Sequence, residues 1–386
     1  MDTKMEAPKR LSVQDAAHPE PPAKETEATP SATSARLGGR EIIVVLIVGL
    51  LILGMLGLIF VRPVRDRGIR LWLLNHAPDQ LIIVNPDTGE EEKKLLIADG
   101  LVQVIFNHRK DTAFIANVVD VANRITVLDT RNYLKLENII VAGVPQGMSI
   151  FPDDKHLAVI TGSKTDFMAG GFDVLDLTEP SQVDPQRKRV VYRERGLRLT
   201  SSIHVDEQGR YIYVLDAKRS SVFIFDCEEK KLVRSLDIGS APISLLYPEQ
   251  GDYFFVSSIA DKSITIFRKA QDPIEIEKAG VVKYVRFRHM AVSPDASILY
   301  APSYEKRIVV VINARERKVA NAFATPEGCQ LIAVSPLGDE LYPVGYDTGK
   351  VFVMNARTGH IRRTVQTQGD FRDIKVLLES EKPSAE

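Results

Sequence analysis

One short motif recurs seven times in this chain of 386 residues and constrains its fold more than any other feature. An apolar stretch closes on a polar residue at Asn85, Asp129, Asp176, Asp226, Arg268, Asn313 and Asn355. The first three copies read LIIVN, ITVLD and FDVLD, and successive copies end 42 to 50 residues apart. A repeat of this length indicates a solenoid, a propeller or an array, so it decides the class of fold before any catalytic motif is considered.

Each repeat holds four short stretches that are rich in Val, Ile, Tyr and Phe. Turns with Pro-Asp or Gly separate these stretches, and helical spacing is absent. Four strands per repeat are what one blade of a β-propeller requires. A β-sandwich would also contain alternating strands, but not seven copies at one period. The sequence therefore predicts an all-β, seven-bladed β-propeller over residues 70–379.

The two ends of this region predict how the ring closes. The chain enters with the second, third and fourth strands of a blade, around Leu71, Leu81 and Lys94, and lacks the innermost strand of that blade. The stretch DFRDIKVLL, residues 370–378, is an extra strand without partners of its own. Pairing it with the first blade would join both ends of the ring and cover exposed sheet edges.

An apolar stretch precedes the repeats. Residues Ile42–Val61 hold twenty positions without a charge or a proline. At about 1.5 Å per residue, a helix of this length crosses the roughly 30 Å core of a bilayer. It is longer than the apolar part of a signal peptide, and RPVRDRGIR follows it. The sequence predicts a single-pass transmembrane helix over residues 41–62 and a short tether over 63–69, rather than a cleaved signal peptide or a core helix.

The remaining terminal segments are polar. Residues 1–40 are rich in Pro, Ala, Glu, Thr and Ser and have few large apolar side chains. They cannot bury enough surface to offset the entropy of ordering, so this N-terminal tail is predicted to be disordered, as are residues 380–386. Either a docking peptide or an inert spacer fits the tail.

Charges around the apolar stretch leave its orientation open. Two arginines precede it and four follow it: Arg36 and Arg40, then Arg62, Arg65, Arg67 and Arg70. This local count alone would keep the large domain in the cytoplasm, but long C-terminal domains often cross despite flanking charge. In either orientation, the four membrane-proximal arginines are placed to reach the headgroups and attract anionic lipid.

Composition and motifs exclude several classes of function. The formal net charge of −1 and the absence of DNA-binding motifs argue against nucleic acid as a partner. Cys227 and Cys329 have neither a CxxC pattern nor histidine companions, so two small buried side chains are expected rather than a disulfide framework or a zinc site. GxSxG, HExxH, P-loop, EF-hand and CxxCH motifs are absent, so we expect no cofactor and favour a protein that is not an enzyme.

Two histidines are candidates for lining the central channel. His204 and His289 fall on stretches that are predicted to be innermost strands. Two histidines there could hold a metal ion or transfer a proton. The simpler interpretation is a hydrogen-bonded channel lining, because no cluster of carboxylates accompanies them.

A basic connection is the second candidate. The segment from Leu177 to Thr200 belongs to the longest of the six intervals between the seven copies. Its basic residues are Arg187, Lys188, Arg189, Arg193, Arg195 and Arg198. We predict a loop that binds an acidic protein or anionic headgroups; a solvated face paired with Glu194 is the alternative. The preceding segment, 162–172, is predicted to be a flexible flap with exposed Phe167 and Met168.

The repeats carry a family resemblance. Pieces such as YIYVLDAKRSSVFIFD and HMAVSPDASILYAPSYEKRIVVVIN are similar to YVTN-type seven-bladed propellers. That group includes surface-layer-like proteins, lactonase-like propellers and the heavy chain of methylamine dehydrogenase. The resemblance implies a propeller on the extracytoplasmic side of the membrane, periplasmic or on the outer face.

These observations leave three functions open. The first is a membrane-tethered module that binds or scaffolds another protein, such as a subunit of a membrane complex. The second, implied by the resemblance alone, is a lactonase-like or oxidoreductase-subunit enzyme with a site at the central channel. The third is lipid or cell-wall binding through the basic segment.

Overall fold

The computed structural model describes residues 65–379, except 77, 98, 119–122, 164–165, 167 and 181–187. The chain divides into two compact units, Met1–Pro63 and Val64–Glu386, of which only the second is described. Within that described part, no helix has the length and apolar character needed to cross a bilayer. The predicted tail, the apolar stretch Ile42–Val61 and Arg62 lie outside the described residues, so the membrane anchor stays a prediction.

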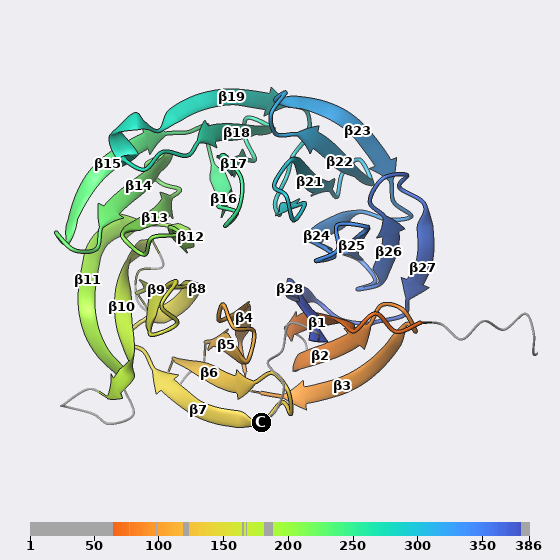
Figure 1. The fold of residues 1–386 in the computed structure, drawn as a ribbon, viewed down its shortest axis with the longest axis horizontal. Helices are drawn as coiled ribbons and strands as arrows, with labels where there is room; N and C mark the ends of the chain where they lie inside the picture. Colours follow the sequence, from red (N-terminus) through yellow and green to blue (C-terminus); the bar gives the residue numbers. More distant parts are fainter. Residues whose placement is uncertain are drawn as a thin grey trace, which may run out of the picture. The chain divides into compact units, whose positions relative to one another are not determined.

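The described residues form seven four-stranded antiparallel sheets around a central axis (Figure 1). The innermost strands are β28 (Phe371–Leu378), β4 (Leu101–Phe106), β8 (Val144–Ile150), β12 (Thr200–Val205), β16 (Pro242–Leu246), β20 (Ala291–Val292) and β24 (Cys329–Val334). The second strands are β1 (Ile69–His76), β5 (Thr112–Asn117), β9 (His156–Gly162), β13 (Tyr211–Asp216), β17 (Tyr253–Ser258), β21 (Ile298–Ser303) and β25 (Glu340–Gly345). In this order they belong to blades 1 to 7.

The third strands carry the repeated motif, as predicted. They are β2 (Asp79–Asn85), β6 (Arg124–Asp129), β10 (Ala169–Pro180), β14 (Ser221–Asp226), β18 (Ser263–Arg268), β22 (Ile308–Asn313) and β26 (Val351–Asn355). The outermost strands are β3 (Glu90–Leu96), β7 (Lys135–Ile140), β11 (Lys188–Arg198), β15 (Lys231–Asp237), β19 (Glu277–Lys283), β23 (Lys318–Ala324) and β27 (Ile361–Val365). A short 3₁₀ turn, Pro273–Glu275, precedes β19.

Burial on both faces explains why the motif is a continuous apolar run. In β22, Val310 packs toward blade 5 beside Phe255, whereas Val309 packs toward blade 7 beside Leu341. Successive side chains of a strand point to opposite faces, and each blade is covered by a neighbour on both sides. The apolar core is therefore divided into layers between adjacent blades, and the outermost strands, such as β3, are largely polar and exposed.

The predicted closure is confirmed. Strand β28 pairs antiparallel with β1, from Ile69 opposite Leu378 to Asn75 opposite Phe371. Ile374 of β28 is buried with residues of blades 1 and 7. The last strand of the ring thus supplies the innermost strand of the first blade.

The prediction of a basic loop after Leu177 is wrong for residues 188–198. These residues form β11, which pairs with β10 from Ala169 opposite Arg198 to Pro180 opposite Lys188. The long interval therefore arises largely from two long strands of 12 and 11 residues. The predicted flap is also shorter than expected, because Ala169–Phe172 belong to β10; Met168 is only partly exposed, and Phe167 lies outside the described residues.

Candidate functional site

The two candidate histidines line different cavities. His204 lies in β12, as predicted, but His289 precedes the two-residue strand β20 rather than lying in a strand. His289 borders a cavity of about 240 Å³, and His204 borders one of about 320 Å³. Ile243 at the start of β16 lines the first cavity, and Leu246 at the end of the same strand lines the second. The cavities therefore open at opposite ends of the channel, and the structure does not bring the histidines together.

His204 has the properties of a packed channel lining. Its ring stacks on Tyr247 with the ring centres 4.6 Å apart, and the Lys269 ammonium lies 4.2 Å from the Tyr247 ring centre. Burial, together with the charges of Lys269 and His108, lowers the pKa of His204 to about 3. The ring is therefore neutral near pH 7. No group of three or more His, Cys, Asp or Glu side chains that could hold a metal occurs within the described residues.

The cavity beside His289 is built by an alternating segment. Val285, Phe287 and Met290 are buried in the apolar core between blades 5 and 6. Arg286 and Arg288, which alternate with them, are exposed. Because Val285 and Phe287 are held in the core, the side chains of Arg286 and Arg288 both face away from it. Because β20 pairs with β21 at only two positions, the segment before β20 is free to diverge from β21 and leave space at the channel mouth.

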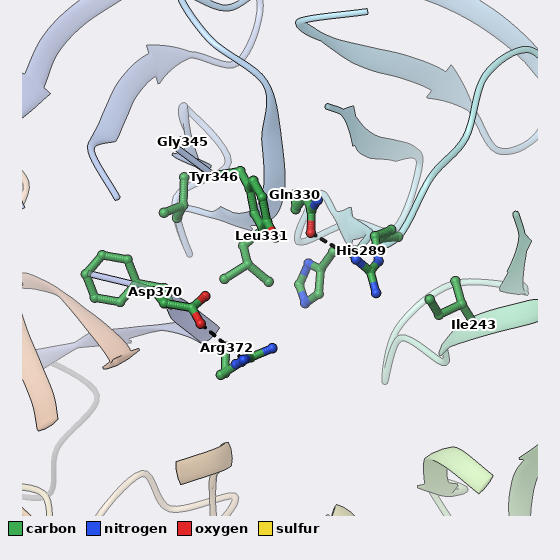
Figure 2. Close-up of a pocket in the computed structure, with 11 residues that line it drawn as sticks. Ile243, His289, Gln330, Leu331, Gly345, Tyr346, Asp370 and Arg372 are labelled. Atoms are coloured by element: carbon green, nitrogen blue, oxygen red, sulfur yellow. Dashed lines mark hydrogen bonds and ion pairs between the residues drawn. The ribbon is translucent and has the colours of Figure 1, made fainter. Parts of the chain in front are cut away.

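Polar groups from blades 1, 6 and 7 meet in this cavity (Figure 2). Arg288 Nη1 donates a 3.3 Å hydrogen bond to Gln330 Oε1, and Arg372 Nη2 lies 3.1 Å from Asp370 Oδ2. Burial lowers the pKa of His289 to about 4, so its ring is neutral near pH 7. The buried Nδ1 atom of His289 has no hydrogen-bond partner among the described residues.

A second hollow of about 210 Å³ lies beside the first and shares Arg288 and Gln330 with it. Its wall includes Arg286 and Tyr304, and the Tyr304 ring lies edge-on to Tyr346 with ring centres 5.2 Å apart. Tyr304 is 41% exposed and Tyr346 is 52% exposed. We call these two adjacent hollows the channel-mouth groove. The polar and aromatic side chains that line it include Arg286, Arg288, His289, Tyr304, Gln330, Tyr346 and Arg372.

A glycine allows the aromatic wall to form. A Cβ atom on Gly328 would lie 2.6 Å from the main-chain oxygen of Tyr304, which is too close for any other residue without movement. The Tyr304 hydroxyl donates a 3.3 Å hydrogen bond to Asp347. The loop that holds Gly328 therefore approaches the loop that holds Tyr304 closely, and this approach places Tyr304 beside Tyr346.

The described basic residues of β11 are paired with carboxylates, four within their own blade and Lys188 with the neighbouring blade. Arg193 and Arg195 lie 2.9 and 2.7 Å from Asp173, and Arg189 lies 2.7 Å from Asp176. The outer two pairs are longer: Lys188 with Glu137 at 3.0 Å and Arg198 with Asp166 at 3.4 Å. The Asp173 and Asp176 carboxylates on β10 are buried. They, and not the expected Glu194, are the main partners of these basic residues. Arg187 lies outside the described residues, and binding by this segment stays a prediction.

The arginines predicted to lie near the membrane differ in their surroundings. Arg67 contacts the carboxylates of Asp87, Asp339 and Glu340. Arg70 is buried and contacts Asp66, Glu92 and Glu379. Arg65 is exposed. Arg67 and Arg70 are therefore held in ion pairs of the propeller, and a role at lipid headgroups stays a prediction for Arg62 and Arg65.

Both cysteines are free thiols. Cys329 is buried and Cys227 is partly buried. Burial raises the pKa of each thiol to about 12, so neither is a reactive thiolate near pH 7. The expectation of a small buried side chain is confirmed for Cys329, whereas Cys227 is only partly buried.

Comparison with known proteins supports the fold. No family model matches the chain, and no curated protein matches it. Solved structures do resemble it. One is a protein of unknown function from Desulfotomaculum acetoxidans, with a TM-score of 0.67 and 14% identity over 80% of this chain and 98% of that one. Another is a periplasmic gluconolactonase from Pseudomonas aeruginosa, with a TM-score of 0.64 and 15% identity over 80% and 99%.

A third similar structure comes from Bacteroides fragilis and carries the provisional name 6-phosphogluconolactonase. Its TM-score is 0.62, with 14% identity over 81% of this chain and 98% of that one. At such low identity the likeness extends to the seven-bladed fold alone. The functions of these proteins therefore do not transfer to this chain by similarity.

Proposed function

We propose that this protein is a membrane-tethered interaction module whose channel-mouth groove recognises another protein, such as a subunit of a membrane complex. The observation that carries the proposal is the position of the Arg288 side chain. Its exposed guanidinium forms no ion pair with a described residue and stands in a groove whose wall includes the exposed rings of Tyr304 and Tyr346. Tyrosine and arginine are enriched among residues that dominate binding at protein interfaces.

The basic strand β11 is a weaker candidate surface, although it has more positive charge. Removing Arg193 from Asp173 would leave a buried carboxylate with less compensation, which is costly. In the groove, by contrast, both partners of the Arg286–Glu305 pair are about half exposed. Exposed pairs contribute about 0–1 kcal/mol, so a ligand can replace one partner at little cost.

The tether in this proposal comes from the predicted helix at Ile42–Val61. Protease protection of intact vesicles, with a tag at each end of the chain, tests it. We expect one tag to be protected and the other to be cleaved, which would also show the side of the propeller. Release of the full-length chain from membranes by carbonate washing would contradict the anchor.

Co-purification from native membranes in mild detergent tests recognition by the groove. We expect a defined partner chain to accompany the wild-type protein and the control Arg131→Glu, which lies in the exposed turn between β6 and β7 and does not line the groove. Tyr346→Ala and Arg288→Glu should lose that partner. A monomeric particle without an associated chain, or a partner that the groove variants retain, would contradict the proposal.

Lactone hydrolysis at the same groove is the second candidate. His289 is neutral near pH 7 and lines the same cavity as Arg372, so it could accept a proton from water while arginine stabilises negative charge. We rank it second because the fold alone links this chain to a gluconolactonase. A pH-stat assay with glucono-δ-lactone distinguishes the two candidates. Saturable hydrolysis that is lost in His289→Gln would replace the interaction proposal. Hydrolysis that is no faster than the spontaneous reaction would support the interaction proposal.

A further inference from the structure

The charge of the channel-mouth groove suggests what it binds. Five charged side chains line the two hollows: Arg286, Arg288, Arg372, Glu305 and Asp370. The three positive side chains outnumber the two negative ones by one, and all three positive side chains are arginines. The planar guanidinium donates paired hydrogen bonds to a carboxylate in a fixed geometry, which a lysine ammonium does not.

All three guanidiniums are available to a ligand. Arg286 and Glu305 lie 2.8 Å apart, and their side chains are 51% and 47% exposed. Arg372 and Asp370 lie 3.1 Å apart, and their side chains are 51% and 46% exposed. Water screens pairs of this kind, so an incoming carboxylate can compete for the arginine. Arg288 has only the neutral Gln330 side chain as a hydrogen-bond partner among the described residues.

The arginines follow the length of the groove. Arg372 borders only the first hollow, Arg286 borders only the second, and Arg288 borders both. A single small anion would be expected to have its ligands gathered around one point. This order instead suits a chain with several carboxylates, and the rings of Tyr304 and Tyr346 offer apolar surface to the residues between them.

We propose that the channel-mouth groove binds an extended, acidic segment of a partner protein. Arg286, Arg288 and Arg372 bind its carboxylates, and Tyr304 and Tyr346 pack against its intervening apolar or proline side chains. This inference rests on the proposed function and adds the chemistry of the partner.

The test uses the full-length protein in detergent and fluorescence anisotropy with two labelled peptides. One alternates Glu with Leu and Pro, and the other has Gln in place of each Glu. We expect the acidic peptide to bind, the Gln peptide to bind at least about tenfold more weakly, and high salt to weaken binding. Arg288→Gln and Tyr346→Ala should each weaken it about tenfold, whereas Arg131→Gln should not change it. Unchanged melting curves would show that these variants are folded.

Other outcomes would overturn the inference. Equal binding of both peptides, or of neither, would remove the acidic segment as the ligand. Displacement of the peptide by inorganic phosphate at similar concentration would reassign the groove to a small anion, and displacement by phosphatidylserine vesicles would reassign it to lipid. If the peptides fail to bind but co-purification still depends on Tyr346, the acidic-segment inference fails while the interaction function stands.

Discussion

Arg67 and Glu340 are 273 positions apart in the chain, yet the Arg67 guanidinium donates a 2.5 Å hydrogen bond to the Glu340 carboxylate. Arg67 also binds Asp87 of blade 1, and Arg362 of blade 7 contacts both Asp87 and Glu340. This cluster joins the first and last blades where the chain enters the ring. The ring is therefore closed twice, by the β28–β1 pairing at the channel and by ion pairs across the junction.

Replacing Arg67 tests the second closure. Asp87 and Glu340 have side chains only 2% and 9% exposed, so Arg67→Met leaves Arg362 as the one described cation that contacts these two buried carboxylates. We expect a loss of about 3 kcal/mol of unfolding free energy, measured by chemical denaturation in detergent. Arg131→Met, in an exposed turn, is the control. Equal stability of the two variants would show that the junction does not depend on this cluster.

Truncation after Gln368 tests the first closure. It removes β28, including the buried Ile374 and Leu377, and exposes an unpaired edge of β1. We expect an insoluble or open domain, because an exposed apolar strand edge promotes aggregation. Solubility and the melting temperature are the measurements, and truncation after Glu379 is the control. An unchanged melting temperature after the longer truncation would contradict the closed ring.

His204 predicts a pH dependence of stability. Its pKa falls from an ordinary value of 6.5 to about 3 on burial, so below about pH 6.5 the unfolded chain binds a proton that the folded chain does not. The contribution of His204 to the unfolding free energy is therefore complete above pH 6.5 and is lost as the pH falls toward 3. We expect the melting temperature of His204→Gln to decline less steeply between pH 7 and 5 than that of wild type. A variant of the exposed His360 is the control; parallel slopes for His204→Gln and wild type would refute the assignment.

Gly328→Ala tests the aromatic wall of the groove. The added Cβ would meet the main-chain oxygen of Tyr304, so the loop must shift. We expect a loss of about 1–3 kcal/mol, measured by denaturation, together with weaker binding of the acidic peptide. At Gly147 the nearest atom to an added Cβ is the terminal methyl of Ile160, at 3.1 Å, so Gly147→Ala should cost less. If both alanine variants are equally stable and bind equally well, Gly328 does not position Tyr304.

Some signals for the groove were present in the sequence. Tyr304 and Tyr346 are 42 residues apart, the same interval that separates the repeat ends Asn313 and Asn355, so both rings occupy equivalent positions in adjacent blades. The alternation of apolar residues and arginines from Val285 to Arg288 also indicated two guanidiniums that face away from the core. The partners of the basic segment were harder to find, because only the register of β10 against β11 places Asp173 beside Arg193.

The sequence by itself determined the number of blades, the identity of their third strands and the strand that closes the ring. Each blade is one supersecondary unit whose apolar pattern repeats locally, so its signal survives without knowledge of distant contacts. Only the tertiary structure decided which polar residues meet. Arg288 and Arg372 come from blades 6 and 1 and border one cavity only because the ring closes, and closure depends on contacts between residues that are hundreds of positions apart.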